Sequence, residues 1–210
     1  MDNLDLARHG VHLGDAGRAL EANLQGSRSL PENVGSDMVV LYCLAHLGRY
    51  DELAEMLERL IVARPGIGGA EDEVMWSTSD IVALQAAVLS KHRQAAELLV
   101  NRLSGSNRRT SGIWISTCTA RHLGGAAALL GRHDEARRYY QEAVKVCTDM
   151  RFRPELALTC LELAELILEH YPDDKKEAAD HLAFCIPEFR DMKMQPALER
   201  ALRHKEVLKA

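Results

Sequence analysis

The sequence predicts an all-α fold: a right-handed α-solenoid of about five helix–turn–helix repeats with a C-terminal capping helix. Two observations predict it. Leucine and alanine dominate a composition that is 47% hydrophobic, whereas the β-branched residues that favour strands are few. A short segment also recurs along the chain at intervals of roughly 34 to 43 residues, which is typical of repeat architectures. Together these observations argue against an extensive β-sheet.

The recurring segment is clearest around Gly48, which is followed three residues later by Asp51 and 17 residues later by Pro65. The same 17-residue separation joins Gly14 and Pro31, which lie 34 residues earlier. Related segments begin at Lys91, Gly131 and Asp174. A nearly constant spacing predicts that each copy folds as one structural unit and stacks on the next.

Each copy is predicted to be two antiparallel helices joined by a tight turn. Gly48 and Gly131 end a first helix in the left-handed conformation that glycine adopts at low cost. Asp51 and Asp134 then begin the second helix, where a carboxylate accepts hydrogen bonds from unpaired amides and meets the positive end of the helix dipole. Pro65 ends the second helix.

The first helices of the pairs are predicted from apolar residues at helical spacing. They cover residues 37–47, 79–89, 117–130 and 154–169. The chain is then a single domain, 1–210, with repeats at about 1–33, 34–70, 74–105, 113–150 and 154–192 and a closing helix at 195–208. Extra residues fall in two loops between repeats, 65–70 and 104–112, as a solenoid permits.

Two of these copies resemble the tetratricopeptide repeat (TPR) family. The first resemblance rests on Gly48, Tyr50, Leu53, Leu57, Leu60 and Pro65, and the second on Leu123, Gly124, Gly131, His133, Ala136, Tyr140 and Ala143. The resemblance implies that the first helices of the repeats line a concave groove. It also implies that protein partners bind in that groove.

A narrower resemblance lies in the last 100 residues. Segments 129–136, 153–164 and 192–202 are similar to the C-terminal helical-repeat region of bacterial regulatory ATPases, which include large transcriptional activators. This resemblance implies a bacterial signalling or regulatory role as a sensor or docking platform. The chain contains no Gly-x-x-x-x-Gly-Lys-Ser/Thr motif for nucleotide phosphates.

Charge and composition exclude several other classes of function. The net charge is −5, so the chain offers no broad basic face to nucleic acid. No apolar run approaches the roughly 18 residues of a membrane span, and the acidic N-terminus is unlike a secretory signal. The cysteines, odd in number and widely spaced, are interpreted as reduced core residues: Cys43, Cys118, Cys147, Cys160 and Cys185. We expect a cytoplasmic protein.

Histidine and cysteine pairs at one-face helical spacing could suggest a metal site. The pairs are His9 and His12, Cys43 and His46, Cys118 and His122, and His181 and Cys185. Because each pair lies in a different repeat and zinc takes four ligands, packing explains them better than coordination. The open alternative is a site where Cys43 and His46 face the histidines of the first repeat. The prediction is no metal and no cofactor.

Other candidate features have structural interpretations. The glycine cluster 66–69 follows a helix, whereas a phosphate cradle precedes one, so an inter-repeat loop is preferred. Arg108 and Arg109 could bind an anion, but a solvated loop explains them better. Trp76 and Trp114 are expected to wedge between repeats, with a ligand anchor as the alternative. No nucleophile–base pair can be assembled, so the chain is not predicted to be an enzyme.

The groove floor follows from the helical register of the first helices. Its predicted partner-binding residues are Arg8, His12, Met38, Tyr42, His46, Ile81, Gln85, Arg121, Glu165 and Glu169. Tyr42 and Arg121 are the expected energetic centres, because tyrosine and arginine are enriched among binding hot spots. The predicted function is a protein–protein interaction module. The alternatives are a small-molecule sensor of a bacterial signalling or transcription-regulating system, and a homo-oligomeric structural protein such as a homodimer.

Overall fold

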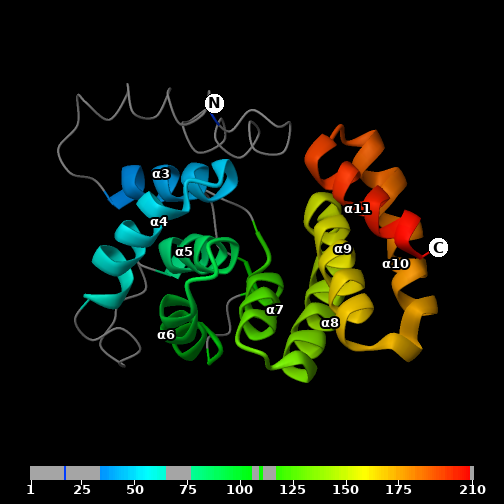
Figure 1. The fold of residues 1–210 in the computed structure, drawn as a ribbon, viewed down its shortest axis with the longest axis horizontal. Helices are drawn as coiled ribbons and strands as arrows, with labels where there is room; N and C mark the ends of the chain where they lie inside the picture. Colours follow the sequence, from blue (N-terminus) through cyan, green and yellow to red (C-terminus); the bar gives the residue numbers. More distant parts are fainter. Residues whose placement is uncertain (1–16, 18–33, 65–76, 106–108, 111–116, 209–210) are drawn as a thin grey trace.

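The computed structural model describes residues 17, 34–64, 77–105, 109–110 and 117–208, and these are almost entirely helical (Figure 1). The helices are α3 (Val34–Leu47), α4 (Tyr50–Leu57), α5 (Ser77–Leu89), α6 (Arg93–Leu103), α7 (Thr119–Leu129), α8 (His133–Asp149), α9 (Arg153–His170), α10 (Lys175–Asp191) and α11 (Gln195–Val207). A π-helical turn, η1 (Glu58–Val62), extends α4, and a 3-10 turn, η3 (Pro172–Asp174), precedes α10. The all-α prediction is confirmed.

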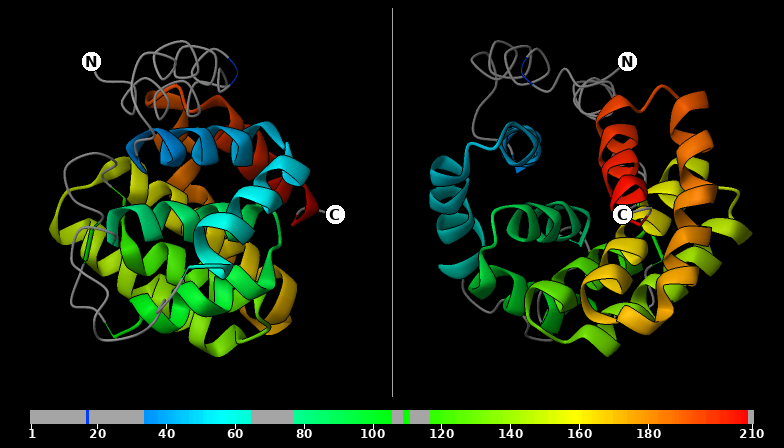
Figure 2. Two further views of the ribbon diagram at one scale, coloured as in Figure 1. Left: turned by 90° about the vertical axis from the view of Figure 1, so that its left-hand side faces the viewer. Right: turned by 45° about the vertical axis from the view of Figure 1, so that its right-hand side comes forward.

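The helices form antiparallel pairs that follow one another around a curve. Figure 2 shows α3, α5, α7, α9 and α11 on the inside of the curve and α4, α6, α8 and α10 on its outside. The pairs are α3 with α4, α5 with α6, α7 with α8, and α9 with α10, and α11 follows the last pair. The predicted repeat and domain bounds stay predictions. Apart from Gly17, the predicted first repeat lies outside the described residues. The glycine cluster 66–69, Trp76, Arg108 and Trp114 also lie outside them.

The turns between helices share one backbone geometry. Gly48 and Gly131 have φ values of 72° and 82°, which confirms the left-handed conformation predicted for them. Lys91, Arg151 and Lys193 adopt the same conformation without being glycine, with φ between 53° and 57°. In each turn the residue that follows donates its N–H to a carbonyl five residues back, as when Arg132 N bonds to Ala127 O at 2.9 Å. This hydrogen bond closes the helix C-terminus in the Schellman pattern, so five turns are built alike.

The predicted role of the aspartates at the second helices needs a correction. Asp51 and Asp134 lie in the first turns of α4 and α8, where the helix dipole favours a carboxylate. Neither helix, however, has a side-chain hydrogen bond at its N-cap. The Asp134 carboxylate instead accepts a hydrogen bond of 2.7 Å from the Tyr171 hydroxyl, because α9 ends directly beside the start of α8.

The apolar core runs between the inner and outer helices. One cluster joins α3 to α7 and contains Leu41, Leu53, Leu84 and Leu99, all fully buried. A second cluster joins α7 to α11 around Leu161, Leu182 and Phe189 and other buried side chains. The five cysteines are free and buried, in agreement with their interpretation as core residues. Of the helices that the structure describes, none has the length and apolar character that crossing a membrane requires.

Candidate interaction groove

The structure distributes the predicted groove residues between the core and the concave surface. Tyr42 and Ile81 are only 4% and 0% exposed and belong to the apolar core. Both side chains therefore pack between helices and offer almost no surface to a partner, so the prediction that Tyr42 is an energetic centre of binding needs a correction. Met38 lies within α3, whereas Arg8 and His12 lie outside the described residues.

His46, in the last turn of α3, and Gln85, within α5, connect two inner helices. The Gln85 Nε2 atom lies 3.2 Å from His46 Nε2, which connects α5 to α3. The His46 ring also lies 4.7 Å from the Tyr42 ring, centroid to centroid, at an angle of 57°. His46 is exposed and Gln85 is partly exposed, so this pair forms a polar rim that rests on the buried tyrosine.

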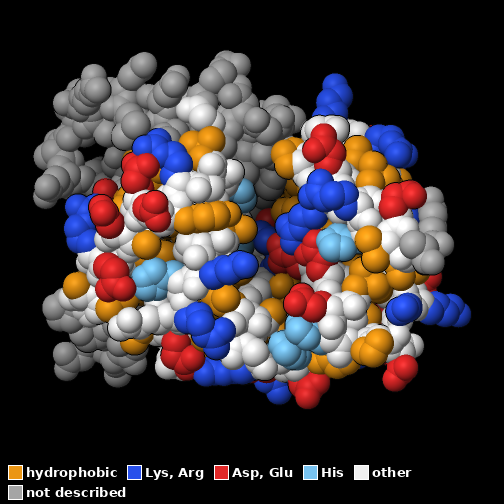
Figure 3. All heavy atoms as spheres, in the orientation of Figure 1, with side chains coloured by type: hydrophobic (Ala, Val, Ile, Leu, Met, Phe, Trp, Pro, Cys, Tyr) orange, Lys and Arg blue, Asp and Glu red, His pale blue; other side chains and the backbone are white. Residues whose placement is uncertain are grey.

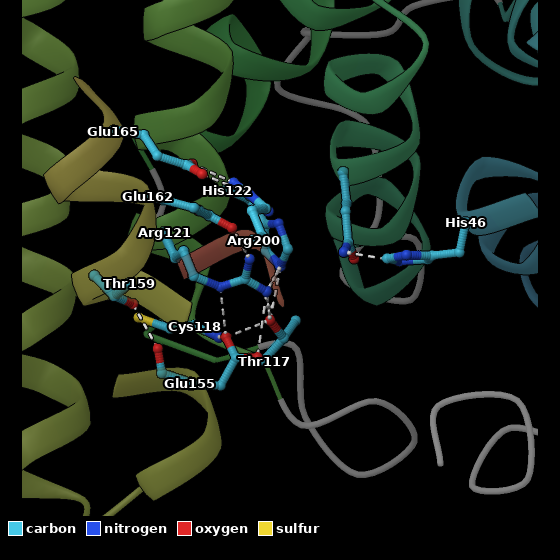
Figure 4. Close-up of polar contacts among 11 residues, drawn as sticks. His46, Thr117, Cys118, Arg121, His122, Glu155, Thr159, Glu162, Glu165 and Arg200 are labelled. Atoms are coloured by element: carbon cyan, nitrogen blue, oxygen red, sulfur yellow. Dashed lines mark hydrogen bonds and ion pairs between the residues drawn. The ribbon is translucent and has the colours of Figure 1, made fainter. Parts of the chain in front are cut away.

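Arg121 lies at the centre of a buried charge cluster between α7 and α9 (Figure 4). It is 5% exposed. Its Nε and Nη2 atoms donate to the two carboxylate oxygens of Glu155 at 3.0 and 3.2 Å. Its Nη1 atom donates to Glu162 Oε1 at 2.8 Å. A planar guanidinium suits this arrangement because its donors point in fixed directions.

Glu155 is held as an anion inside the protein. Its Oε2 atom also accepts hydrogen bonds from the Thr117 hydroxyl at 2.7 Å and from the Cys118 N–H at 2.9 Å. Burial alone would raise the pKa of Glu155, but the charge and hydrogen bonds of Arg121 and the Cys118 amide hold it at about 2. Burial and the charge of Arg121 lower the pKa of the neighbouring His122 well below its usual value, so this imidazole is neutral.

Glu165 attaches the last helix to the array. Its Oε1 atom accepts a hydrogen bond from Arg200 Nε at 2.6 Å, and its Oε2 atom accepts one from Arg200 Nη2. His204 Nε2 lies 2.8 Å from the same Oε1 atom. Arg200 and His204 are one helical turn apart on α11, so one carboxylate of α9 holds one face of α11.

Glu162 lies between these two arrangements on α9. Its side chain is 18% exposed and receives one hydrogen bond, from Arg121. Burial raises the pKa of Glu162, and Glu165 and Glu155 add to this rise; the attraction of Arg121 and Arg200 offsets it only partly. The negative charge of Glu162 is thus stabilised less by neighbouring cations than the charge of Glu155 is.

A tyrosine from an outer helix reaches this cluster. Tyr140 of α8 is 4% exposed, and its ring packs directly beneath Gly124 of α7. A Cβ atom at Gly124 would lie 2.8 Å from the ring, so only glycine permits this approach. The hydroxyl lies 3.5 Å from the position that a Cβ of Gly125 would take. Burial, and then the charge of Glu162, raise the pKa of Tyr140 well above its usual value.

A second buried charge cluster lies at the start of α5. Asp80 is fully buried, and its two carboxylate oxygens pair with Arg64 Nη1 at 2.7 Å and Arg102 Nε at 2.5 Å. These arginines follow η1 and end α6, so the cluster joins the ends of three helical segments. Its partners come from outer helices, and we assign it to the core and not to the groove.

Sequence reasoning selected Arg121 and Glu165 but missed most residues that surround them. The missed residues are Thr117, Tyr140, Glu155, Glu162, Arg200 and His204. One signal was available: Glu155, Glu162 and Glu165 are spaced seven and three apart on a helix whose interior is mostly apolar, which places them on one side of it. Glu169, the last predicted groove residue on α9, is exposed near the end of that helix.

The His/Cys pairs do not form a larger ligand set in the described part of the chain. Within those residues, no group of three or more His, Cys, Asp or Glu side chains is placed to hold a metal ion. His9 and His12 lie outside the described residues, so the alternative of a site shared with Cys43 and His46 stays open. The predicted absence of a metal or cofactor stays a prediction.

Comparisons with known proteins give similarity in fold. No protein-family model and no curated protein matches the chain. A solved structure of TPR-like repeats from a putative kinesin light chain of Podospora anserina is 18% identical, with a TM-score of 0.51 over 91% of this chain and 94% of that one. MamA, from residue 41 to its end, of Desulfovibrio magneticus RS-1 is 17% identical, with a TM-score of 0.47 over 91% and 97%.

The fold is therefore a TPR-like α-solenoid, as the sequence predicts. At these identities the similarity extends to the fold alone. The narrower resemblance to bacterial regulatory ATPases is not shown by the comparisons and stays a prediction.

Proposed function

We propose that this chain is a protein-interaction module that binds a polypeptide partner in the concave groove lined by α3, α5, α7, α9 and α11. The proposal rests mainly on one observation: charged and polar side chains of several inner helices converge on a common hollow. Figure 3 shows Arg, Lys, Asp and Glu side chains gathered at the edge of this hollow, over α9 and α11. The TPR-like fold supports the same interpretation.

The rigidity of the groove adds to this support. Arg121 donates to Glu155 between α7 and α9, and Arg200 donates to Glu165 between α11 and α9, so each pair is held by hydrogen bonds that cross between helices. Side chains that are already ordered lose little conformational entropy when a partner binds. A groove of this kind presents a defined pattern of donors and acceptors to a peptide or a helix.

The same ion pairs favour binding over catalysis. The charged groups around the hollow are paired with each other, and a buried base such as Glu155, with a pKa of about 2, is a weak proton acceptor at neutral pH. We propose a module that catalyses no reaction. The sensor and homo-oligomer alternatives have no specific support among the described residues and stay predictions, as does a cytoplasmic location.

The test is a selection of binding peptides from a displayed random library, followed by substitutions in the groove. Tyr42 and Arg121, the expected centres, are too deeply buried to be truncated without damage to the fold. Instead, we expect His46→Ala and Gln85→Ala each to weaken the selected peptides about tenfold while helicity by circular dichroism is unchanged. Gln141→Ala, an exposed glutamine on outer helix α8, is the matched control.

Two outcomes would overturn the proposal. In one, no peptide is enriched on the immobilised protein. In the other, selected peptides bind both groove variants as tightly as the unmodified protein and lose affinity in variants of the outer helices.

A further inference from the structure

Two of the five buried cysteines lie against each other. Cys118 is the N-cap residue of α7, and Cys147 lies in the last turn of α8. Because α7 and α8 are an antiparallel pair, the start of one lies beside the end of the other (Figure 1). Both side chains are fully buried in the same small apolar cluster, and their thiols form a hydrogen bond with each other. A disulfide bond requires two cysteines in such proximity.

The other three cysteines are explained by the core alone. Burial raises the pKa of Cys43 to about 11 and that of Cys160 to about 12. Cys185 donates its S–H to the Leu182 carbonyl oxygen at 3.7 Å, and burial raises its pKa to about 12. A thiol in apolar surroundings keeps its proton and is inert, because only the thiolate is a good nucleophile.

Cys118 and Cys147 differ in how readily each thiol ionises. The hydrogen bond that the Cys147 S–H donates lowers the pKa of Cys118, and the charge of Arg121 lowers it further, against the effects of burial and of Glu155. The same hydrogen bond, and then burial, raise the pKa of Cys147. The N-terminus of α7 also favours a negative charge on Cys118. A more acidic thiol beside a second, protonated thiol is typical of redox-sensitive pairs.

An oxidant reaches this pair only when the start of α7 opens locally, because both sulfurs are buried. The chain at this point is joined to an earlier segment by an isolated β-bridge between Cys118 and Thr110. The Thr119 N–H donates to the Arg109 carbonyl oxygen at 3.1 Å beside it. An isolated bridge opens at low free-energy cost, because it is not part of a longer hydrogen-bonded ladder. A small oxidant such as hydrogen peroxide needs only a small opening.

We propose that Cys118 and Cys147 are a redox-active pair that forms an intramolecular disulfide bond on reaction with hydrogen peroxide. The Cys118 thiolate attacks one peroxide oxygen, the O–O bond breaks, and the departing hydroxide takes up the proton that Cys118 released. The Cys147 sulfur then attacks the resulting sulfenic acid at sulfur, and the S–O bond breaks. The hydroxyl group leaves with the Cys147 proton as water. Two thiols thereby lose two electrons, and one peroxide becomes two waters.

The bond would join α8 to the residue whose backbone amide binds Glu155. The Cys118 N–H donates to Glu155 Oε2 at 2.9 Å, in the cluster that also holds Arg121 (Figure 4). Oxidation therefore adds a covalent restraint at the anchor of the inner helices α7 and α9. The inference does not depend on a partner or on the proposed function.

The test counts thiols in protein that is oxidised while folded. After a small molar excess of hydrogen peroxide, unfolding in denaturant and titration with dithiobis(nitrobenzoic acid) should detect two fewer than the five thiols of the untreated chain. Dithiothreitol should restore all five. Peptide mapping without reduction should show Cys118 joined to Cys147. Helicity by circular dichroism should be unchanged, and the melting temperature should rise by about 5 °C or more, because the bond constrains the unfolded chain.

Two variants isolate the pair. Cys147→Ser should form no intramolecular disulfide bond and show no rise in melting temperature with peroxide. Cys43→Ser, which removes a buried cysteine of α3, is the matched control and should still lose two thiols, as the unmodified protein does. If Cys147→Ser does not fold, peptide mapping of the unmodified protein and of Cys43→Ser still decides the question.

Several results would overturn the redox pair. One is a full thiol count after peroxide. Another is a mapped bond that joins Cys160 to Cys185 or joins two molecules. A third is an oxidised protein that melts at a lower temperature, because the disulfide bond would then be incompatible with the fold. Each of these results leaves the proposed binding in the concave groove unaffected.

Discussion

Two buried carboxylates, Asp80 and Glu155, anchor the two halves of the solenoid in different ways. Asp80 is paired with two arginines, whose side chains are 15% and 10% exposed. Glu155 is paired with Arg121, which is 6% exposed, and also accepts hydrogen bonds from the hydroxyl of Thr117 and the amide of Cys118. The second cluster continues through Arg121 to Glu162, whose side chain is 18% exposed.

The comparison shows how a buried ion pair contributes to structure or to a binding surface. The Asp80 cluster joins the ends of helical segments and has both carboxylate oxygens bound by arginine. The Glu155 cluster is continuous with partly exposed groups on the concave side. A buried ion pair can thus fix the position of a residue, here Glu162, that is itself partly exposed.

The largest expected effect is a difference in the free energy of unfolding between substitutions of these two carboxylates. Glu155→Gln should lower the free energy of unfolding by about 3–5 kcal/mol, because it leaves Arg121 buried with an incomplete set of acceptors. Asp80→Asn should cost less, about 1–3 kcal/mol, because its arginines lie closer to water. Urea denaturation of both variants measures the difference. An equal loss, or a greater loss for Asp80→Asn, would contradict this ranking.

The pH dependence of stability should reveal how much the ionised carboxylate of Glu155 contributes to the free energy of unfolding. Its folded-state pKa of about 2 lies below the unfolded value of about 4.3, so the anion stabilises the fold above the unfolded value, and this contribution is lost as the pH falls through about 2. The expected loss is about 3 kcal/mol. The pKa of Glu162 is raised in the folded protein, so its ionisation lowers the stability of the fold as the pH increases.

The measurement compares the unmodified protein with Glu155→Gln between pH 6 and pH 2, which isolates the contribution of Glu155. We expect the difference in unfolding free energy between the two proteins to shrink as the solution is acidified. A difference that stays constant across this range would mean that Glu155 is not held as an anion by the fold.

A smaller effect is expected where Tyr140 passes beneath α7. Gly124→Ala places a Cβ atom 2.8 Å from the ring and should cost about 1–3 kcal/mol through overpacking. Gly125→Ala is the matched control: its Cβ would meet Val88 at 3.4 Å, and alanine is the better helix former by about 0.5–1 kcal/mol. Thermal denaturation should rank Gly124→Ala clearly below Gly125→Ala; the reverse order would show that the ring does not require the glycine.

The smallest expected change in stability concerns two matching turns, the one at Lys91 before α6 and the one at Gly131 before α8. Lys91 adopts a left-handed φ of 57° in the turn before α6, where Gly131 occupies the matching turn before α8. Lys91→Gly should stabilise the protein by about 0.5–1 kcal/mol, and Gly131→Ala should destabilise it by a similar amount. Both changes are measured by the midpoint of denaturation. If Lys91→Gly were destabilising, the lysine side chain would contribute more than its backbone strain costs.

The sequence by itself determined the repeat frame of this protein. Gly48 and Gly131 mark the positions of two turns, because the left-handed conformation at a helix end favours glycine. The apolar stripes of the inner helices follow from the 3.6-residue period of the α-helix. Even Lys91, which departs from the glycine pattern, could be located from its spacing. Local conformational preference and periodicity are properties of neighbouring residues, so they are readable from the chain alone.

Only the tertiary structure decided which residues of the inner face remain available to a partner. Helical register assigned Tyr42, Gln85 and Glu165 to one face, yet Tyr42 is buried by neighbouring helices and Gln85 is partly exposed. The carboxylate partners Glu155 and Glu162 of Arg121 lie 34 and 41 residues away, and Tyr140 packs against Gly124 of α7 from an outer helix. The physical reason is that burial, ion pairing and pKa depend on distances between helices, which are set by packing and not by periodicity.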